Sequence, residues 1–370
     1  MTRARVFSPA PRDVWNGLVS GNPAALPSQS PTWVDAICQV HAYEDASRCY
    51  ELADGRTLVL PMVRRRRAPG PLATEHSMAP TWGAGGLLTS GPLRVDDVRT
   101  VFDDLAARPV LRTTIRPDFL QAPVWAAAKP ARAIELPLVH HVLDLDRSFD
   151  ELAARFSKMA RKAIRKAERE GVKIEHASGR SFVDEYYRLY EGWVTRRAAE
   201  RGIPLPIALH RGRANEPLAR LRLLADTFGD TFRIWIARLD GDAVAAMITL
   251  IQGDTALAWR AASNIEVAGP VRANDLLHRE AIEFATTQGC RYYNMGESGG
   301  VESLMRFKVR FGATPRPHAG YRLERLPLTP ATAQLNRARS RAEDLVLDLA
   351  GRRNRGGASD PTGEDAAVED

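Results

Sequence analysis

Cysteine is scarce in this sequence, and its scarcity excludes two kinds of stabilisation. The chain contains three cysteines, Cys38, Cys49 and Cys290. They are odd in number and far apart, and no CxxC or HxxxH spacing occurs, so we expect neither a disulfide framework nor a metal site. Each cysteine is predicted to be a lone buried thiol, with a cysteine nucleophile as the alternative.

Long apolar runs are also absent. No run approaches the roughly 20 residues needed to cross a bilayer. The stretch from Met1 to Pro9 lacks the apolar core of a signal peptide. The sequence therefore predicts a cytoplasmic protein. Its 370 residues, 44% of them hydrophobic, are enough for two globular domains and a tail.

Acidic residues are fewer than basic residues in this chain. The chain has 52 Lys and Arg against 45 Asp and Glu, a formal net charge of +7. A basic protein attracts polyanions such as tRNA, nucleotides, CoA or anionic lipid headgroups, and charge alone does not choose among them. DNA is not among the partners we expect. The run from Arg64 to Arg67 predicts a solvated strand end, and weak contact with an anionic membrane surface is the alternative hypothesis.

One stretch near the C-terminus combines glycines with cations. Residues 291–295 predict a short strand, residues 296–300 a flexible glycine turn and residues 301–311 a helix. Backbone N–H groups and the cations Lys308 and Arg310 would then surround one crevice, which suits an oxyanion, a phosphate or a carboxylate. A plain strand–helix connection with solvated charges is the alternative.

A second stretch, residues 148–170, predicts the clearest helix of the chain. Ser148 followed by Glu151 is a capping-box pattern, and Gly171 is a natural stop. The polar faces of this helix are crowded with lysine and arginine, and like charges at helical spacing cost roughly a few tenths of a kcal/mol per pair. Either an anionic ligand or RNA, or acidic residues elsewhere in the fold, would balance this charge.

The remaining chain alternates helices and strands. Asp54-Gly55 predicts a hairpin turn, and residues 232–262 predict a three-stranded meander. Residues 203–209 predict a loop broken by prolines. Residues 68–93 are rich in glycine and proline, and Trp82 within them favours a pocket-lining loop over a disordered linker.

Four short motifs stand out in the second half of the chain. They are residues 161–171 (RKAIRKAEREG), 273–282 (ANDLLHREAI), 293–298 (YNMGES) and 307–312 (FKVRFG). Together they resemble the Fem-type (FemABX) and BioF2-like acetyltransferase branch of the GNAT superfamily. The resemblance covers residues 145–326 well and extends weakly to residues 28–90.

The resemblance implies a mixed α/β (α+β) fold with two tandem GNAT-like domains. Each would be a mixed, largely antiparallel sheet flanked by helices. We place a degenerate N-terminal domain, which would bind the acceptor, at residues 1–144 and the acyltransferase domain at residues 145–328. Residues 329–350 predict a terminal helix and residues 351–370 a disordered acidic tail.

The resemblance also implies an activity. It predicts an N-acyltransferase that moves an acyl or aminoacyl group from acyl-CoA or aminoacyl-tRNA to an amine of a cell-wall precursor or small metabolite. The donor is a co-substrate, so no permanently bound cofactor is expected. Lys308 matches the lysine of the family's FK motif and would stabilise the developing oxyanion or the leaving ribose hydroxyl. Glu297 is the better placed of the candidate bases, and His278 is expected to be structural.

The remaining site residues follow from the same resemblance. The implied donor-binding residues are Arg161, Arg165, Lys166, Asn274, Ser298 and Arg310. The implied acceptor pocket contains Trp82, Gly85 and Gly86.

The sequence departs from the GNAT pattern in one respect. The usual pyrophosphate loop, R/Q-x-x-G-x-G/A, is absent, and residues 268–274 (AGPVRAN) replace it. This change disfavours CoA and favours a larger or different donor. Together with the basic helix, it supports the alternative hypothesis of a non-catalytic GNAT-like module that binds RNA or an anionic precursor.

Overall fold

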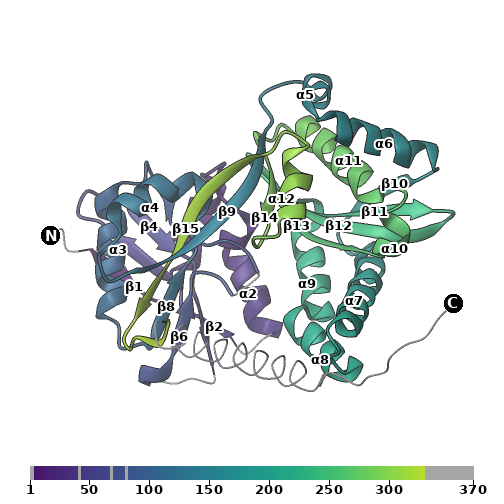
Figure 1. Cartoon of the computed structure of the whole chain (residues 1–370). Helices are drawn as coiled ribbons and strands as arrows, with labels where there is room; N and C mark the ends of the chain where they lie inside the picture. The colour runs from purple at the N-terminus through teal and green to yellow at the C-terminus, as the bar shows by residue number, and fades with distance from the viewer. Residues whose placement is uncertain (1–3, 41–42, 67–69, 80–81, 330–370) are drawn as a thin grey trace, which may run out of the picture. The chain divides into compact units, whose positions relative to one another are not determined.

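The computed structural model describes residues 4–40, 43–66, 70–79 and 82–329, and Figure 1 shows its helices and strands. The strands are β1 (Arg5–Phe7), β2 (Tyr43–Asp45), β3 (Arg48–Glu51), β4 (Thr57–Leu60), β5 (Val63–Arg65), β6 (Thr74–His76), β7 (Leu88–Thr89), β8 (Arg112–Ile115), β9 (Ile134–Asp144), β10 (Lys173–Ser178), β11 (Phe232–Leu239), β12 (Asp242–Gln252), β13 (Thr255–Ser263), β14 (Tyr292–Glu297) and β15 (Thr314–Glu324). The α-helices are α1 (Arg12–Ser20), α2 (Pro31–Val40), α3 (Val95–Ala107), α4 (Ala122–Ala128), α5 (Phe149–Arg155), α6 (Lys158–Arg169), α7 (Val183–Glu200), α8 (Leu205–Asn215), α9 (Leu218–Phe228), α10 (Ile265–Ala268), α11 (Ala273–Thr287) and α12 (Glu302–Val309).

Most strands belong to one continuous mixed sheet. Its order is β10-β11-β12-β13-β14-β9-β15-β8-β6-β5-β2, and a smaller sheet has the order β1-β3-β4-β7. The long strands β9 and β15 pair antiparallel and run side by side across the middle of Figure 1. Because β15 lies between β9 and β8, a strand from the end of the chain joins the two halves of the large sheet.

The expected fold class is confirmed. Most ladders are antiparallel, with parallel ones at β13–β14 and β6–β8, and helices flank the sheets. The predicted boundary between residues 144 and 145 falls at the end of β9, in the middle of the large sheet. The sheet therefore runs through this boundary, and the division into domains at that point stays a prediction.

Helices cover both faces of the β10–β14 half of the sheet. Alternate residues of β11 face opposite sides, as the strand period of two requires. Ile234 and Ile236 join a core with residues of α2, α7 and α9, whereas Trp235 and Ala237 join a core with residues of α5, α6 and α11. A third core, which includes Phe102 from α3, lies in the β8 half. The result is a rigid platform from which the ends of β13 and β14 project.

Several sequence predictions are confirmed. The hairpin at Asp54-Gly55 joins β3 to β4, and the meander is β11-β12-β13. The predicted loop at residues 203–209 is wrong, because α8 begins at Leu205. Pro204 is its N-cap and Pro206 lies in its first turn, where the missing N–H has no helical partner to lose.

The single basic helix predicted at residues 148–170 is also wrong, because the structure divides it into α5 and α6. Ser157 separates the two helices, and its Oγ accepts a hydrogen bond from Ala160 N at 3.1 Å. Phe156 turns inward at the break, 5.2 Å from Phe311 between ring centroids. A serine cap and a buried aromatic side chain outweigh the helical continuity of the sequence here.

β13 and β14 diverge, and this divergence positions the candidate site. They pair in parallel only from Thr255↔Tyr292 to Leu257↔Asn294, although β13 continues to Ser263 and β14 to Glu297. The separated ends expose backbone and side chains between two strands, which is where a ligand can pass through a sheet.

The turn between β12 and β13 packs closely against the backbone of Pro23. Gly253 has a φ of +51°, and a Cβ there would lie 2.0 Å from Pro23 O. Gly253→Ala is expected to lower the free energy of unfolding by about 2 kcal/mol or more, because strain at positive φ adds to the clash. Gly241→Ala in the β11–β12 turn is the matched control, since its Cβ meets nothing within 4 Å at a φ of +92°. Urea denaturation of both variants measures the difference, and equal losses would contradict the role of Pro23.

The predicted acidic tail at residues 351–370, and the predicted terminal helix at residues 329–350 beyond its first residue, lie outside the described residues. Among the described residues, no helix is long and apolar enough to cross a membrane. Cys38, Cys49 and Cys290 are free thiols, and burial raises the pKa of each to about 11.

Candidate functional site

The glycine turn after β14 returns the chain so that Lys308 reaches the end of that strand. Gly296, Gly299 and Gly300 have φ angles of 70°, 54° and 78°, a backbone region that favours glycine. Lys308 Nζ donates hydrogen bonds to Gly296 O at 2.9 Å and to Glu297 O at 2.8 Å. An ammonium group has three N–H donors, so one remains for a ligand.

Lys308 is buried, with 4% of its surface exposed. Burial disfavours the charged form and lowers the pKa of Lys308 from 10.5 to about 8, while the charge of Glu297 opposes this shift. Burial and the Lys308 charge in turn lower the pKa of His141. The end of β14 therefore holds a sequestered ammonium that is mostly protonated at neutral pH.

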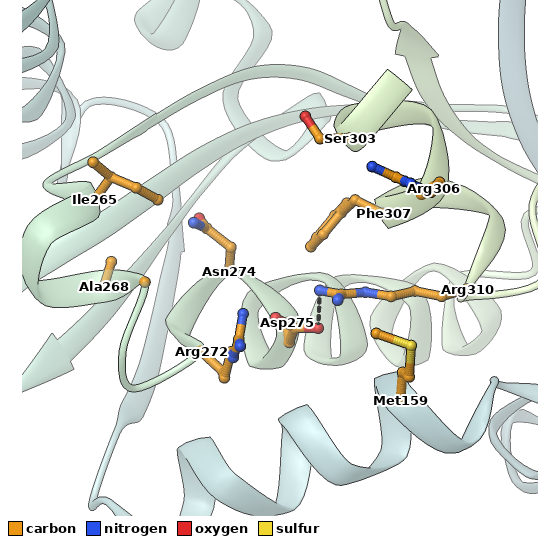
Figure 2. A pocket seen from close by; sticks show the side chains of 11 residues that line it. Met159, Ile265, Ala268, Arg272, Asn274, Asp275, Ser303, Arg306, Phe307 and Arg310 are labelled. Carbon is orange, nitrogen blue, oxygen red and sulfur yellow. Dashed lines mark hydrogen bonds and ion pairs between the residues drawn. The ribbon is translucent and has the colours of Figure 1, made fainter. Parts of the chain in front are cut away.

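A cavity of about 580 Å³, which we call the α11 cavity, lies between the start of α11 and α12. Figure 2 shows its lining from α10 and the loop after it, from the start of α11, from α12 and from α6; the lining residues are Met159, Ile265, Ala268, Gly269, Arg272, Asn274, Asp275, Ser303, Arg306, Phe307 and Arg310. The first N–H groups of a helix lack intrahelical partners and carry partial positive charge. With the arginines around it, the cavity is suited to an anionic ligand.

The pair Arg310 and Asp275 holds the floor of the α11 cavity. Arg310 Nη2 donates to Asp275 Oδ1, which joins α12 to the first turn of α11 (Figure 2). The side chains are 17% and 4% exposed. Burial raises the pKa of Asp275 to about 6, and Arg310 and Arg272 oppose that rise. The loop before α11 ends at Arg272 with a φ of +62°, so the N-cap of this helix is left-handed.

The predicted donor-binding residues divide into two groups. Asn274 and Arg310 line the α11 cavity, so the structure brings these two together. Arg161, Arg165, Lys166 and Ser298 do not line it. Arg161 instead donates to Ala154 O and Phe156 O at the end of α5. Its guanidinium is committed to the break between α5 and α6, which the sequence analysis did not foresee.

The other three residues of that prediction lie elsewhere. Arg165 is exposed and Lys166 half-buried on α6, away from the cavity lining. Ser298 is buried, with its Oγ 3.4 Å from His141 Nδ1. From α6 the side chain that reaches the cavity is Met159, which is 72% exposed although apolar.

A second cavity, of about 300 Å³, lies where β13 and β14 diverge, and we call it the β14 cavity. Its walls come from both halves of the large sheet; they include Gly83, Ala84, Arg116, Asp118, His140, Leu257, Trp259, Arg260, Asn294, Gly296, Glu297 and His318. The two backbone carbonyls that Lys308 binds belong to Gly296 and Glu297 of this wall. Lys308 itself is not among the residues that line either cavity, and its ammonium holds two backbone carbonyls of this wall in place.

The glycine-rich loop was predicted to line a pocket through Trp82, Gly85 and Gly86, and its neighbours Gly83 and Ala84 do so instead. Trp82 is buried and its Nε1 donates to Asn215 O at 3.2 Å. A Cβ on Gly85 would lie 2.4 Å from Ser77 Oγ, and one on Gly86 2.8 Å from Gln121 Oε1. These glycines are needed for close packing of the loop.

Glu297 lines the β14 cavity beside His140 and Arg116, two residues that sequence reasoning missed. Its Oε1 lies 3.6 Å from His140 Nε2 and 3.9 Å from Arg116 Nη1. A hydrogen bond with His140 lowers the pKa of Glu297, and burial opposes that shift. His140 and His318 are 178 residues apart in sequence, yet their ring centroids are 4.6 Å apart. No local motif signals this pair, because register between β9 and β15 creates it.

His278, expected to be structural, packs in an apolar setting. Its Nδ1 lies 3.0 Å from Tyr293 Oη, and its ring lies 5.2 Å from that of Phe307. Burial, followed by the charges of Lys308 and Arg310, lowers its pKa to about 3. A histidine held neutral in this way suits a packing role.

A comparison with protein families finds a match in the second half of the chain. Residues 154–308 match the family described as "Acetyltransferase (GNAT) domain". The fold is similar to the crystal structure of FemX, with 10% sequence identity, a TM-score of 0.60 and coverage of 86% of this chain and 97% of that one. A comparison with curated proteins finds no match.

Two further solved structures share the fold. One is a conserved protein of unknown function from Bacteroides thetaiotaomicron, 13% identical, with a TM-score of 0.55 and coverage of 87% of this chain and 99% of that one. The other is L-PGS from Bacillus licheniformis, 13% identical, with a TM-score of 0.51 and coverage of 93% and 97%. The expected resemblance to the GNAT superfamily is confirmed, and that to the Fem-type branch is confirmed in the fold. The BioF2-like resemblance stays a prediction.

Proposed function

Because residues 154–308 match the GNAT acetyltransferase domain family, we propose that this chain is an N-acyltransferase. It transfers an acyl or aminoacyl group from acyl-CoA or aminoacyl-tRNA to an amine of a cell-wall precursor or small metabolite. The observation that carries this proposal is the buried Lys308 ammonium at the end of β14. It lies on the helix that lines the α11 cavity and binds the carbonyls of the β14 cavity wall.

In this proposal the α11 cavity takes the anionic part of the donor. Arg272, Arg306 and the start of α11 supply positive charge there, and phosphate binding at a helix N-terminus needs no side-chain loop of a fixed pattern. The absent pyrophosphate motif is therefore compatible with a phosphate-bearing donor. The reactive ester or thioester of the donor then extends between β13 and β14 toward the β14 cavity, which binds the acceptor amine.

The proposed reaction is a nucleophilic acyl substitution at the carbonyl carbon of the donor. The amine nitrogen attacks the acyl carbonyl carbon, and the new C–N bond places negative charge on the carbonyl oxygen. The third N–H of Lys308 stabilises that charge, since preorganised donors act strongly where water is excluded. Collapse breaks the bond to sulfur or ribose oxygen, the amine nitrogen loses one proton, the leaving group gains one, and the amide remains.

A direct assay tests the proposal. Purified protein is incubated with radiolabelled acetyl-CoA or charged tRNA and an extract of amine-bearing precursors, and the acylated product is identified by mass spectrometry. RNase treatment abolishes transfer if tRNA is the donor and leaves it unchanged if CoA is. Absence of transfer from both donors, with either donor still bound, would contradict the enzymatic proposal.

A variant in the α11 cavity gives a second test of the proposed function. Arg306→Gln is expected to raise the KM for the donor about tenfold with little change in kcat, because it removes a charge that binds donor phosphate in ground and transition states alike. Arg201→Gln, an exposed arginine at the end of α7, is the control and should leave KM unchanged. Arg165→Gln distinguishes the donors, since a tRNA backbone would also contact the exposed face of α6.

A non-catalytic binding module is the second candidate function. The exposed basic face of α6 favours it, through Lys158, Lys162, Arg165 and Arg169. Salt-dependent binding of tRNA or of an anionic precursor, without turnover of any acyl donor, would support this module. Weak contact with an anionic membrane surface is a separate hypothesis, and flotation with anionic vesicles at low salt tests it.

A further inference from the structure

The β14 cavity contains a group of titratable side chains that come from four separate segments. Asp118 follows β8, His140 lies on β9, Glu297 ends β14 and His318 lies on β15. Each lines the same space of about 300 Å³. The hydrogen bonds around them determine which imidazole nitrogen carries a proton, and hence which of these groups can accept one from a ligand.

His140 has both ring nitrogens engaged. Asn294 Oδ1 accepts a hydrogen bond from Gly296 N at 2.8 Å, which fixes the orientation of the Asn294 amide. Asn294 Nδ2 therefore donates to His140 Nδ1 at 3.2 Å. The neutral ring then carries its proton on Nε2, which faces Glu297 Oε1 at 3.6 Å. His140 is thus a link between an amide and a carboxylate.

His318 has the opposite tautomer. Its Nδ1 lies 3.1 Å from Arg316 O, and a carbonyl oxygen only accepts, so Nδ1 carries the proton. The lone pair of the neutral ring is then on Nε2. Burial and the neighbouring His140 lower the pKa of His318, which keeps the ring neutral at pH 7. Glu297, Arg116 and His140 are the charged and titratable groups that act on it across the cavity.

Asp118 supplies a second acceptor in the same cavity. It is 5% exposed, and its Oδ1 accepts from Leu120 N at 2.9 Å. Its Oδ2 is buried and has no hydrogen-bond partner within the described part of the chain. An unpaired buried carboxylate oxygen is costly, so a donor from a ligand would remove that cost.

We propose that the β14 cavity is the acceptor site, in which Asp118 Oδ2 binds the acceptor amine and His318 Nε2 removes its proton. This inference rests on the proposed acyl transfer. When the amine nitrogen bonds to the acyl carbon, its N–H proton passes to His318 Nε2 and the ring becomes an imidazolium. The imidazolium returns the proton to the leaving sulfur or oxygen, so the enzyme ends unchanged. The substrate class is a primary amine small enough to enter beside Gly83 and Ala84.

The kinetic test uses acetyl-CoA and charged tRNA as donors with ethanolamine and the active precursor fraction as acceptors. His318→Asn is expected to lower kcat about 100-fold, a typical effect of losing a general base, with folding checked by thermal denaturation. The residual rate should rise with pH as free amine accumulates. Asp118→Asn should raise the KM for the acceptor about tenfold and change kcat little. His210→Asn on exposed α8 is the control.

A measurement without turnover separates this inference from the proposed function. Histidine-selective ¹⁵N NMR should find His318 protonated at Nδ1 and His140 at Nε2, and ethanolamine should shift the His318 Nε2 resonance. His318 found as the Nε2–H tautomer overturns the inference, whether or not the protein transfers acyl groups. So does an active His318→Asn variant with unchanged kcat and pH profile. Complete inactivity of the wild-type protein would instead count against the proposed function.

Discussion

Lys308→Met is expected to lower kcat for acyl transfer about 10²–10³-fold, the typical cost of removing one donor from an oxyanion site. The KM for the donor should change little, because the ammonium lies outside the lining of the α11 cavity. Two of its N–H groups donate to Gly296 O and Glu297 O. These hydrogen bonds orient the third N–H group and restrict the rotation of the side chain before the reaction begins. Steady-state kinetics with the donor that the RNase assay identifies measures the effect.

The control for this variant is Lys173→Met, which removes an exposed lysine from β10 and should retain full activity. A folded Lys308→Met protein with wild-type kcat would exclude Lys308 from the mechanism. The pH dependence is a further check. Since the pKa of Lys308 is about 8, activity that needs the ammonium should fall as the pH rises above 8.

The contribution of Lys308 to stability should rise with pH, whereas the activity that depends on its ammonium should fall. The folded pKa of Lys308, about 8, lies below the usual 10.5, so the unfolded chain binds more protons between these values. The contribution of Lys308 to the free energy of unfolding therefore increases as the pH rises through that window. Comparing urea denaturation of wild type and Lys308→Met at pH 8 and 10 isolates this contribution from other groups.

Arg310→Met is expected to lower the free energy of unfolding by about 3–5 kcal/mol at pH 8, because it leaves the buried Asp275 carboxylate without its partner. The pair joins α11 to α12, so the loss should also loosen the α11 cavity and weaken donor binding. Urea denaturation followed by circular dichroism measures the stability change. Arg306→Met, an exposed arginine on the same helix, is the matched control and should cost less than about 1 kcal/mol.

The pH dependence of this loss follows from Asp275. Its pKa is already raised to about 6 by burial, and loss of Arg310 raises it further. A carboxyl group whose pKa is raised on folding favours the folded state at low pH and loses that contribution as the pH rises through the raised pKa. The gap between wild type and variant should therefore narrow from pH 8 to pH 4.5. The double variant Arg310→Met/Asp275→Asn should recover much of the loss at pH 8, and no recovery would contradict the buried-pair explanation.

Local sequence patterns predicted the elements around the site but not their neighbours. The alternating run 232–262 and the turn at Asp54-Gly55 gave strands because side-chain period and turn chemistry are local properties. The break between α5 and α6 at Ser157 was not predicted. The apolar stripe continues on both sides of Ser157, so the sequence pattern favoured one helix over a serine N-cap. Arg161 was predicted to bind the donor, and in the structure its guanidinium donates to Ala154 O and Phe156 O at the end of the preceding helix.

The sequence by itself determined the fold class, the glycine turn after β14 and the lysine that follows it, because strand, turn and helix signals lie within one short stretch. Tertiary structure alone decided what that lysine binds and which residues share its surroundings. His140 and His318 meet because β9 and β15 pair in one register, and Asp118 joins them from a loop after β8. Contacts between distant strands depend on the packing of the whole sheet, and no local pattern of residues encodes them.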